Sequence, residues 1–175
     1  KTTLPVILST GLSSLNEIKH AVETFKKTNN HQLILLHCKA VYPPSDKEID
    51  LNNIDLLKEE FKCSVGFSDH SLGIEIPIAA IAKGAEVFEK HFTIDKKLAG
   101  WDHAISADTN EMKLIVNAAK KVKNALGEKN RIIYKDEIEM RKKFRRSIVA
   151  KKDLIKGETI SLDKIDYKRP GYGIE

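Results

Sequence analysis

The chain has 175 residues, of which 41% are hydrophobic and 31% are charged, and its formal net charge is +5. These values are typical of a soluble globular protein. No apolar run approaches the roughly 18 residues that a membrane-spanning helix needs, and no signal-peptide pattern is present. The two cysteines, Cys38 and Cys63, lie in or beside expected core strands. We therefore expect both to be reduced, and the protein to be cytoplasmic with no membrane association.

Strand and helix patterns alternate along the first 126 residues. Short apolar runs that end at polar clusters predict strands, and apolar residues that recur every three or four positions predict helices. The expected strands are Pro5–Ser9, Gln32–Cys38, Ser64–Ser71 and Ala85–Thr93, and the expected helices are Ser13–Lys27, Leu51–Phe61, Ile74–Lys83 and Thr109–Leu126, the last closed by Gly127. Four βα units in succession with near-continuous apolar strands predict a parallel sheet covered by helices.

Four βα units amount to half of a (β/α)8 TIM barrel, which takes ~200 residues or more when complete. The expected fold class is therefore α/β, with residues 1–127 forming half of such a barrel. A small open α/β sheet is the alternative, although no glycine-rich phosphate loop follows any strand. Because the chain begins at Lys1 without Met and enters a strand almost at once, we also expect it to be a piece of a longer protein.

The remaining residues differ in character from the barrel-like part. Residues 128–146 lack clear periodicity and are expected to be a linker, while short β-type runs over residues 147–175 predict a different, smaller module. Residues 120–152 hold 13 Lys and Arg side chains against four Asp and Glu side chains, a net charge of +9. This stretch has only Tyr134 and Phe144 as stacking rings and no known binding motif, so we expect no nucleic-acid partner. The preferred interpretation is a solvated helix face plus linker, and the alternatives are help in attracting an anionic substrate or in ordering a subunit contact.

Two histidines, His70 and His91, stand at the ends of neighbouring expected strands. Side chains two residues apart in a strand face the same way, so Ser68 shares a face with His70, and Glu89 shares a face with His91. With strand backbones about 4.8 Å apart, the two imidazoles are able to converge on one small object. Asp69 should point to the opposite face, where an N-cap or packing role is expected.

Further polar side chains gather at the same rim, which in barrels is the active face. The full set is Ser9, Thr10, His37, Tyr42, Ser68, His70, Glu89, His91, Asp102 and His103. Two neutral imidazoles beside carboxylates suit Mn, Zn, Co or Fe, and such an ion polarises a carbonyl or activates a water. Glu89 is placed to orient the site or to move a proton. A structural role is the alternative for each histidine, above all for His37, which has no polar partner two residues earlier.

Four runs of sequence resemble one known family. They are LLHCKAVYP, VGFSDHSLGIEIPIAAIAKGAEVFEKHFTIDK, AGWDHAIS and KRPGYGI, and they resemble the N-acetylneuraminate (sialic acid) synthases, including the legionaminic and pseudaminic acid synthases. The likeness covers essentially the whole chain. It implies the C-terminal half of a (β/α)8 barrel, the start of a small antifreeze-like (SAF) domain over residues 147–175, and a domain-swapped homodimer.

The resemblance also implies a reaction and its catalytic residues. The family's enzymes are transferases of carbohydrate biosynthesis, which condense phosphoenolpyruvate with an N-acetylated amino sugar, typically N-acetylmannosamine or its 6-phosphate, to give a nonulosonic acid and phosphate. His70 and His91 match the family's divalent-metal ligands, with Mn as the expected ion and Mg, Co or Zn as alternatives. Glu89 matches a catalytic residue beside them that orients the sugar aldehyde or relays its proton.

Other matched positions concern the substrates. Ser68 matches a contact to the phosphate of phosphoenolpyruvate, while Tyr42 and Asp102, like Glu89, match residues around the sugar acceptor. Arg169 matches an arginine that the SAF domain extends into the partner subunit's site.

The sequence departs from the family at Ala40, where many relatives carry a polar side chain, and at Trp101, which replaces a common proline. Both lie near the acceptor position and leave the sugar undetermined. The family's first four βα units are absent from the sequence, so we expect the chain to be inactive alone unless a second fragment or a partner copy completes the barrel. Another metal-dependent aldolase or lyase, and a carbohydrate-binding module without activity, are the alternative functions.

Overall fold

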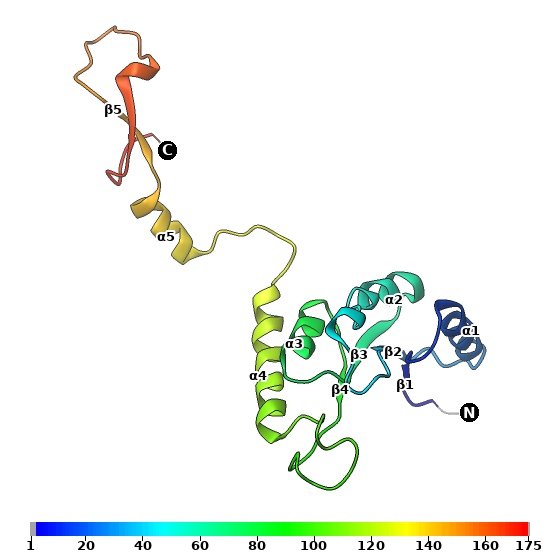
Figure 1. Ribbon diagram of the computed structural model, residues 1–175. Helices are drawn as coiled ribbons and strands as arrows, with labels where there is room; N and C mark the ends of the chain where they lie inside the picture. Colours follow the sequence, from blue (N-terminus) through cyan, green and yellow to red (C-terminus); the bar gives the residue numbers. More distant parts are fainter. Residues whose placement is uncertain (1–2, 175) are drawn as a thin grey trace. The chain divides into compact units, whose positions relative to one another are not determined.

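The computed structural model describes residues 3–174. The chain divides into two compact units, Lys1–Gly127 and Glu128–Glu175. The first unit holds a four-stranded parallel sheet whose strands lie in chain order (Figure 1). Its elements are β1 (Val6–Ser9), α1 (Leu15–Lys26), β2 (Leu33–Cys38), the short 3-10 helix η1 (Asp46–Glu48), α2 (Asn53–Phe61), β3 (Ser64–Asp69), α3 (Glu75–Ala82), β4 (Phe88–Lys90) and α4 (Thr109–Leu126).

Capping side chains fix where α1 and α4 begin. The Ser14 hydroxyl accepts a hydrogen bond from the Glu17 backbone N–H, and the Glu17 carboxylate accepts one from the Ser14 backbone N–H. Asp108 and Glu111 form the same reciprocal pair at the start of α4. Such pairs satisfy backbone N–H groups that the first helical turn leaves free. Gly127 ends α4 with a φ of +56°, which glycine adopts without steric cost.

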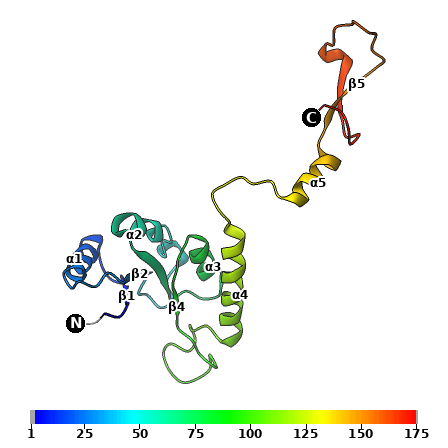
Figure 2. The same ribbon diagram turned by 180° about the vertical axis from the view of Figure 1, so that it is seen from behind.

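One face of the sheet packs against the helices. Leu35 of β2 and Val65 of β3 are fully buried there, together with Ile54 of α2 and Ala80 of α3. The opposite face is more open, and Ile7 of β1 is 53% exposed on it. Figure 2 shows the same unit from behind, with the helices following the strands around one side of the curled sheet. The predicted α/β class with a half-barrel sheet is therefore confirmed.

Two details differ from the expected elements. The strand expected at Ala85–Thr93 is shorter, because β4 covers only Phe88–Lys90 and the chain then makes a single bridge from Phe92 to Ala107. The stretch 128–146, expected to be a linker, contains the helix α5 (Lys135–Phe144). This helix buries none of its side chains, which explains why the sequence shows no apolar period there. Its Lys, Glu, Met and Arg residues favour helix by intrinsic propensity.

The second unit adds a two-stranded antiparallel sheet to α5. Its strands are β5 (Ser147–Ala150) and β6 (Ile165–Lys168), with the 3-10 helix η2 (Leu162–Lys164) directly before β6. Large apolar side chains remain open to solvent in this unit, for example Ile155 at 79% and Leu162 at 81% exposure. Within residues 3–174, no helix has both the length and the apolar character needed to cross a membrane.

Candidate active site

The carboxyl ends of β3 and β4 hold the polar residues of the candidate site. The register pairs Ser68 with Glu89 and Asp69 with Lys90. The Ser68 hydroxyl donates a 2.7 Å hydrogen bond to Glu89 Oε1. Side chains alternate between the faces of a sheet, so this pair lies on the open face while Val65 and Phe67 of β3 face the helices. The face that the sequence predicts for Ser68 and Glu89 is therefore the face on which they meet.

His70 and His91 follow the two strands directly, and their rings lie close together. The ring centroids are 5.3 Å apart. The Tyr42 ring, from the loop after β2, lies 4.3 Å from the His70 ring and 5.7 Å from the His91 ring. Three strand ends thus bring two imidazoles and one phenol to the same point, as expected for His70, His91 and Tyr42 from their places in the sequence.

The surroundings of His70 favour a neutral imidazole with one free nitrogen. His70 is 9% exposed, and its Nδ1 lies 3.1 Å from the Lys39 carbonyl oxygen. Because a carbonyl only accepts hydrogen bonds, Nδ1 carries the proton and Nε2 is left with a lone pair. Burial lowers the pKa of His70 below its ordinary value, against an upward effect of the Lys39 carbonyl. The Cys38 sulfur lies 3.9 Å from the same Nδ1.

Asp102 reaches the site from the loop between β4 and α4. Its Oδ2 lies 3.9 Å from His91 Nδ1, and its side chain is 61% exposed. The loop is anchored on either side, because Ser106 Oγ donates to the Asp102 carbonyl oxygen at 2.6 Å and Thr93 Oγ1 lies 2.8 Å from His103 Nδ1. The anchored loop holds a carboxylate beside His91 and leaves it open to solvent. Trp101, next to it, is 99% exposed.

The donor set of the site meets part of the needs of a divalent ion. His70 and His91 supply two imidazole nitrogens, which suit Mn, Co or Zn when water or substrate oxygens fill the remaining positions. Within residues 3–174, no group of three or more His, Cys, Asp or Glu side chains is arranged to hold a metal ion. An ion held by this pair alone would keep open positions for water or substrate.

Three other predicted rim residues have their own protein partners. His37 is 6% exposed on the helix side of the sheet, with its Nε2 2.6 Å from the Ile49 carbonyl oxygen, and Thr10 Oγ1 donates to the Leu36 carbonyl at 2.9 Å. His103 is paired with Thr93, as the anchoring of the loop requires. These contacts tie the three side chains to neighbouring backbone or loop atoms. Arg169 belongs to the second unit, where it is exposed and directly follows β6.

Sequence reasoning did not single out Lys90. Its side chain is only 2% exposed and forms an ion pair of 2.6 Å with Asp69. A signal was available in the sequence, because Lys90 alternates with Glu89 and His91 and so has to face the helices.

Comparison with known proteins identifies related sequences and structures. Residues 1–131 match the NeuB family. An uncharacterized protein from Methanocaldococcus jannaschii is 47% identical over 175 residues, which cover 100% of this chain and 52% of that protein. The N,N'-diacetyllegionaminic acid synthase of Legionella pneumophila is 41% identical over 98% of this chain and 49% of its own length.

A solved structure is similar as well. The crystal structure of the N-acetylneuraminic acid (sialic acid) synthetase from Leptospira borgpetersenii, in complex with citrate, matches with a TM-score of 0.72 and 41% identity. The match covers 81% of this chain and 50% of that one. The chain thus spans about half the length of the curated relatives it matches.

Proposed function

Because this chain belongs to the NeuB family, we propose that it forms the metal-binding half of the active site of a nonulosonic acid synthase. The reaction is the condensation of phosphoenolpyruvate with an N-acetylated amino sugar, with release of phosphate. The observation that carries the proposal is the meeting of His70, His91 and Tyr42 next to the hydrogen-bonded Ser68–Glu89 pair. The names of the legionaminic acid synthase and of the sialic acid synthetase support the same class of product.

The two histidines would hold a divalent ion, with Mn the first choice and Mg, Co or Zn as alternatives. When bound, such an ion supplies Lewis-acid polarisation of the sugar's aldehyde oxygen. His70 is suited to this role because its Nδ1–H is engaged by Lys39, which leaves Nε2 available at neutral pH. An imidazole held through its second nitrogen in this way is oriented before the ion arrives.

The remaining residues of the site act on the substrates directly. Attack of the enol carbon of phosphoenolpyruvate on the aldehyde forms the new C–C bond, water adds at the resulting cationic carbon, and phosphate then leaves. Glu89 orients the aldehyde or relays the proton that its oxygen gains. Ser68 contacts the phosphate of phosphoenolpyruvate, and Tyr42 and Asp102 contact the sugar acceptor. We also propose that Arg169 binds substrate from an SAF domain that begins near residue 147, in a domain-swapped dimer.

The experiment that tests this function uses a chimera. The half of the Legionella pneumophila synthase that matches this chain is replaced by residues 1–175, and phosphate release is measured with phosphoenolpyruvate, Mn²⁺ and several N-acetylated amino sugars. Phosphoenolpyruvate with ¹⁸O in its bridging position should deliver the label to phosphate, because the C–O bond breaks. A folded chimera that releases no phosphate with any sugar contradicts the proposal, and formation of pyruvate from the acid product would instead indicate an aldolase.

A further inference from the structure

A buried ion pair lies on the helix side of the sheet, behind the candidate site. Lys90 Nζ is 2.6 Å from Asp69 Oδ2, and the two side chains are 2% and 0% exposed. In the sequence, Asp69 lies between Ser68 and His70, and Lys90 lies between Glu89 and His91. The Asp69–Lys90 pair therefore joins the same two strands as the Ser68–Glu89 hydrogen bond, one residue further along and on the opposite face of the sheet.

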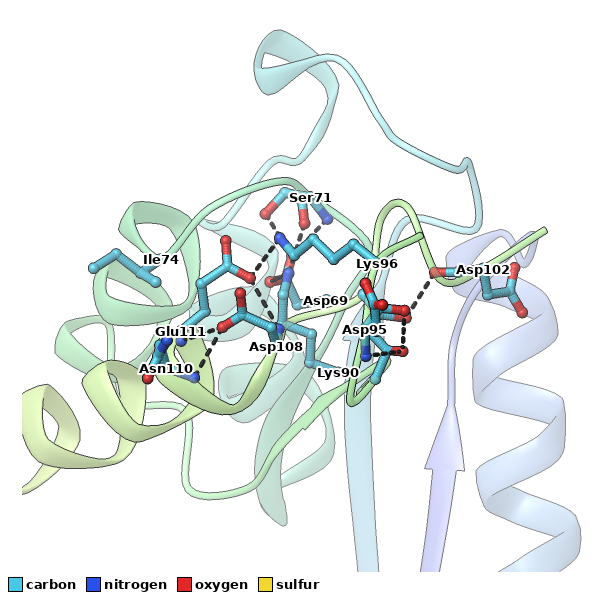
Figure 3. Close-up of polar contacts among 12 residues, drawn as sticks. Asp69, Ser71, Ile74, Lys90, Asp95, Lys96, Asp102, Asp108, Asn110 and Glu111 are labelled. Atoms are coloured by element: carbon cyan, nitrogen blue, oxygen red, sulfur yellow. Dashed lines mark hydrogen bonds and ion pairs between the residues drawn. The ribbon is translucent and has the colours of Figure 1, made fainter. Parts of the chain in front are cut away.

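The same two side chains also hold the turn that follows β3. Lys90 Nζ donates to the Ser71 carbonyl oxygen at 2.6 Å. Asp69 Oδ1 accepts hydrogen bonds from the Ser71 backbone N–H at 2.9 Å and from the Ser71 hydroxyl at 2.7 Å. Figure 3 shows Asp69 and Ser71 together with Lys90. His70 stands between Asp69 and Ser71, so both of its neighbours in the chain are tied to Lys90.

The strand ladder ends where this network begins. Asp69 and Lys90 are the last residues of β3 and β4 that pair with each other, and β4 has only three residues. His70 and His91 each lie one residue beyond this last pair, so the β3–β4 ladder does not reach them, and the His91 carbonyl instead accepts a hydrogen bond from the Ala107 backbone N–H at 2.8 Å. At this point the contacts of Lys90 with Asp69 and with the Ser71 carbonyl cross from the end of β4 to the end of β3.

We propose that Asp69, Lys90 and Ser71 form a positioning network that sets the distance and the orientation of His70 and His91. The inference rests on the proposed function, since it assigns these residues to the site at which the two imidazoles act. The three residues touch no substrate. They act through the backbone on either side of His70 and immediately before His91.

Stability alone does not account for this arrangement. Two charges taken out of water lose their hydration, and replacement of such a pair by neutral side chains of similar volume is often neutral or stabilising. A purely structural ion pair and a positioning pair therefore make different predictions. Removal of a structural pair changes only the stability of the fold, whereas removal of a positioning pair changes the geometry of the imidazoles in a protein that is still folded.

The test uses the full 175-residue chain with the double substitution Asp69→Asn and Lys90→Met. The carboxamide oxygen introduced at position 69 still accepts the two Ser71 hydrogen bonds, and no unpaired charge is left buried. The matched control is Lys19→Met with Glu60→Gln, which removes a 2.8 Å ion pair between the partly exposed side chains of α1 and α2. Thermal unfolding of all three proteins establishes that they are folded.

Two readouts report on the histidines. In the metal-free protein, ¹⁵N NMR of the imidazoles should show one Nδ1–H tautomer for His70 in the parent chain and in the control, and a mixture of tautomers in the double variant. Titration with Mn²⁺ alone, followed by electron paramagnetic resonance, should show binding weakened roughly tenfold to hundredfold in the double variant, as is usual for residues that orient metal ligands.

Unchanged tautomer and unchanged Mn²⁺ affinity in a folded double variant overturn the proposal. If the double variant does not fold, Ser71→Ala removes a single contact, and a His70 tautomer identical to the parent's overturns it in the same way. If the parent chain binds no Mn²⁺, the proposed metal function fails, while the tautomer measurement still decides whether the network positions His70.

Discussion

Ser68 and Glu89 are joined by a 2.7 Å hydrogen bond across the ends of two neighbouring parallel strands, on the sheet face that the helices leave open. A second hydrogen bond of the same kind joins Ser64, at the start of β3, to Glu86, just before β4, at 2.8 Å. The two pairs have the same kinds of side chain and similar hydrogen-bond lengths. Only the first lies next to the paired imidazoles, which makes the second a matched control.

Glu89→Gln in the chimeric synthase should lower the turnover number by about 10²–10⁴-fold, because a carboxamide cannot relay a proton. The thermal unfolding midpoint should stay near that of the parent, since Glu89 is exposed and Gln still accepts the hydrogen bond from Ser68. Steady-state phosphate release measures the effect. Glu86→Gln should leave turnover unchanged, and equal losses in the two variants would show that Glu89 has no special role.

Gly66→Ala should destabilise the first unit. Gly66 of β3 faces the open side, and an added Cβ would lie 2.3 Å from the Val87 carbonyl oxygen and 2.5 Å from Leu36 Cδ2. The carbonyl cannot move freely, because it accepts a hydrogen bond from the Phe67 backbone N–H at 2.8 Å. Overpacking of this kind typically costs about 1–3 kcal/mol.

Urea unfolding measures this loss, with Ser64→Ala on the same strand and the same face as the control. Equal unfolding midpoints for the two variants would mean that the sheet accommodates the added methyl group at position 66 without loss of stability.

Most of the fold and part of the site follow from the sequence because both depend on local periodicity. Alternation within strands is sufficient to place Ser68 and Glu89 on one face, with His70 and His91 beyond them. Alternation does not predict the length of β4, because pairing after Lys90 depends on where Ala107 returns to the sheet.

Two features were not predicted from the sequence, for a different reason. Alternation places Lys90 on the helix side of the sheet, but a lysine in a short strand suggests exposure, and its ion pair depends on the register that places Asp69 beside it. Helix α5 has no apolar stripe, so its hydrophobic pattern did not predict a helix. Neither a buried ion pair nor a helix without a buried face leaves a pattern in local hydrophobicity.

Acid should destabilise the first unit, in part through His37. Burial lowers the pKa of His37 below its ordinary value of 6.5, against the smaller upward effect of the Ile49 carbonyl. The unfolded chain therefore binds a proton at a higher pH than the folded chain, so the free energy of unfolding falls as the pH drops below about 6.5 toward the lowered pKa. Each such histidine contributes a loss of up to about 1.4 kcal/mol per pH unit in that window.

Urea unfolding at pH 7.5, 6.5 and 5.5 measures this dependence. His37→Gln should make the pH dependence of the unfolding free energy shallower. Part of the dependence should remain in this variant, because the pKa of His70 is also lowered. The same slope in the parent chain and in the variant would contradict the assignment to His37.

Trp101 should report sugar binding by its fluorescence. It is the single tryptophan of the chain, it is 99% exposed, and it precedes Asp102, which we propose to contact the sugar acceptor. A sugar held by Asp102 would cover part of the indole. Emission should therefore shift to shorter wavelength as an N-acetylated amino sugar is added to the chimeric synthase, with the tryptophans of its Legionella pneumophila half replaced by phenylalanine. Asp102→Ala removes the hydrogen-bonding carboxylate and should weaken the titration about tenfold, in line with the ~1.5 kcal/mol or more of a hydrogen bond to a charged group. Calorimetric binding of the sugar without any change in Trp101 emission would place the acceptor away from this loop.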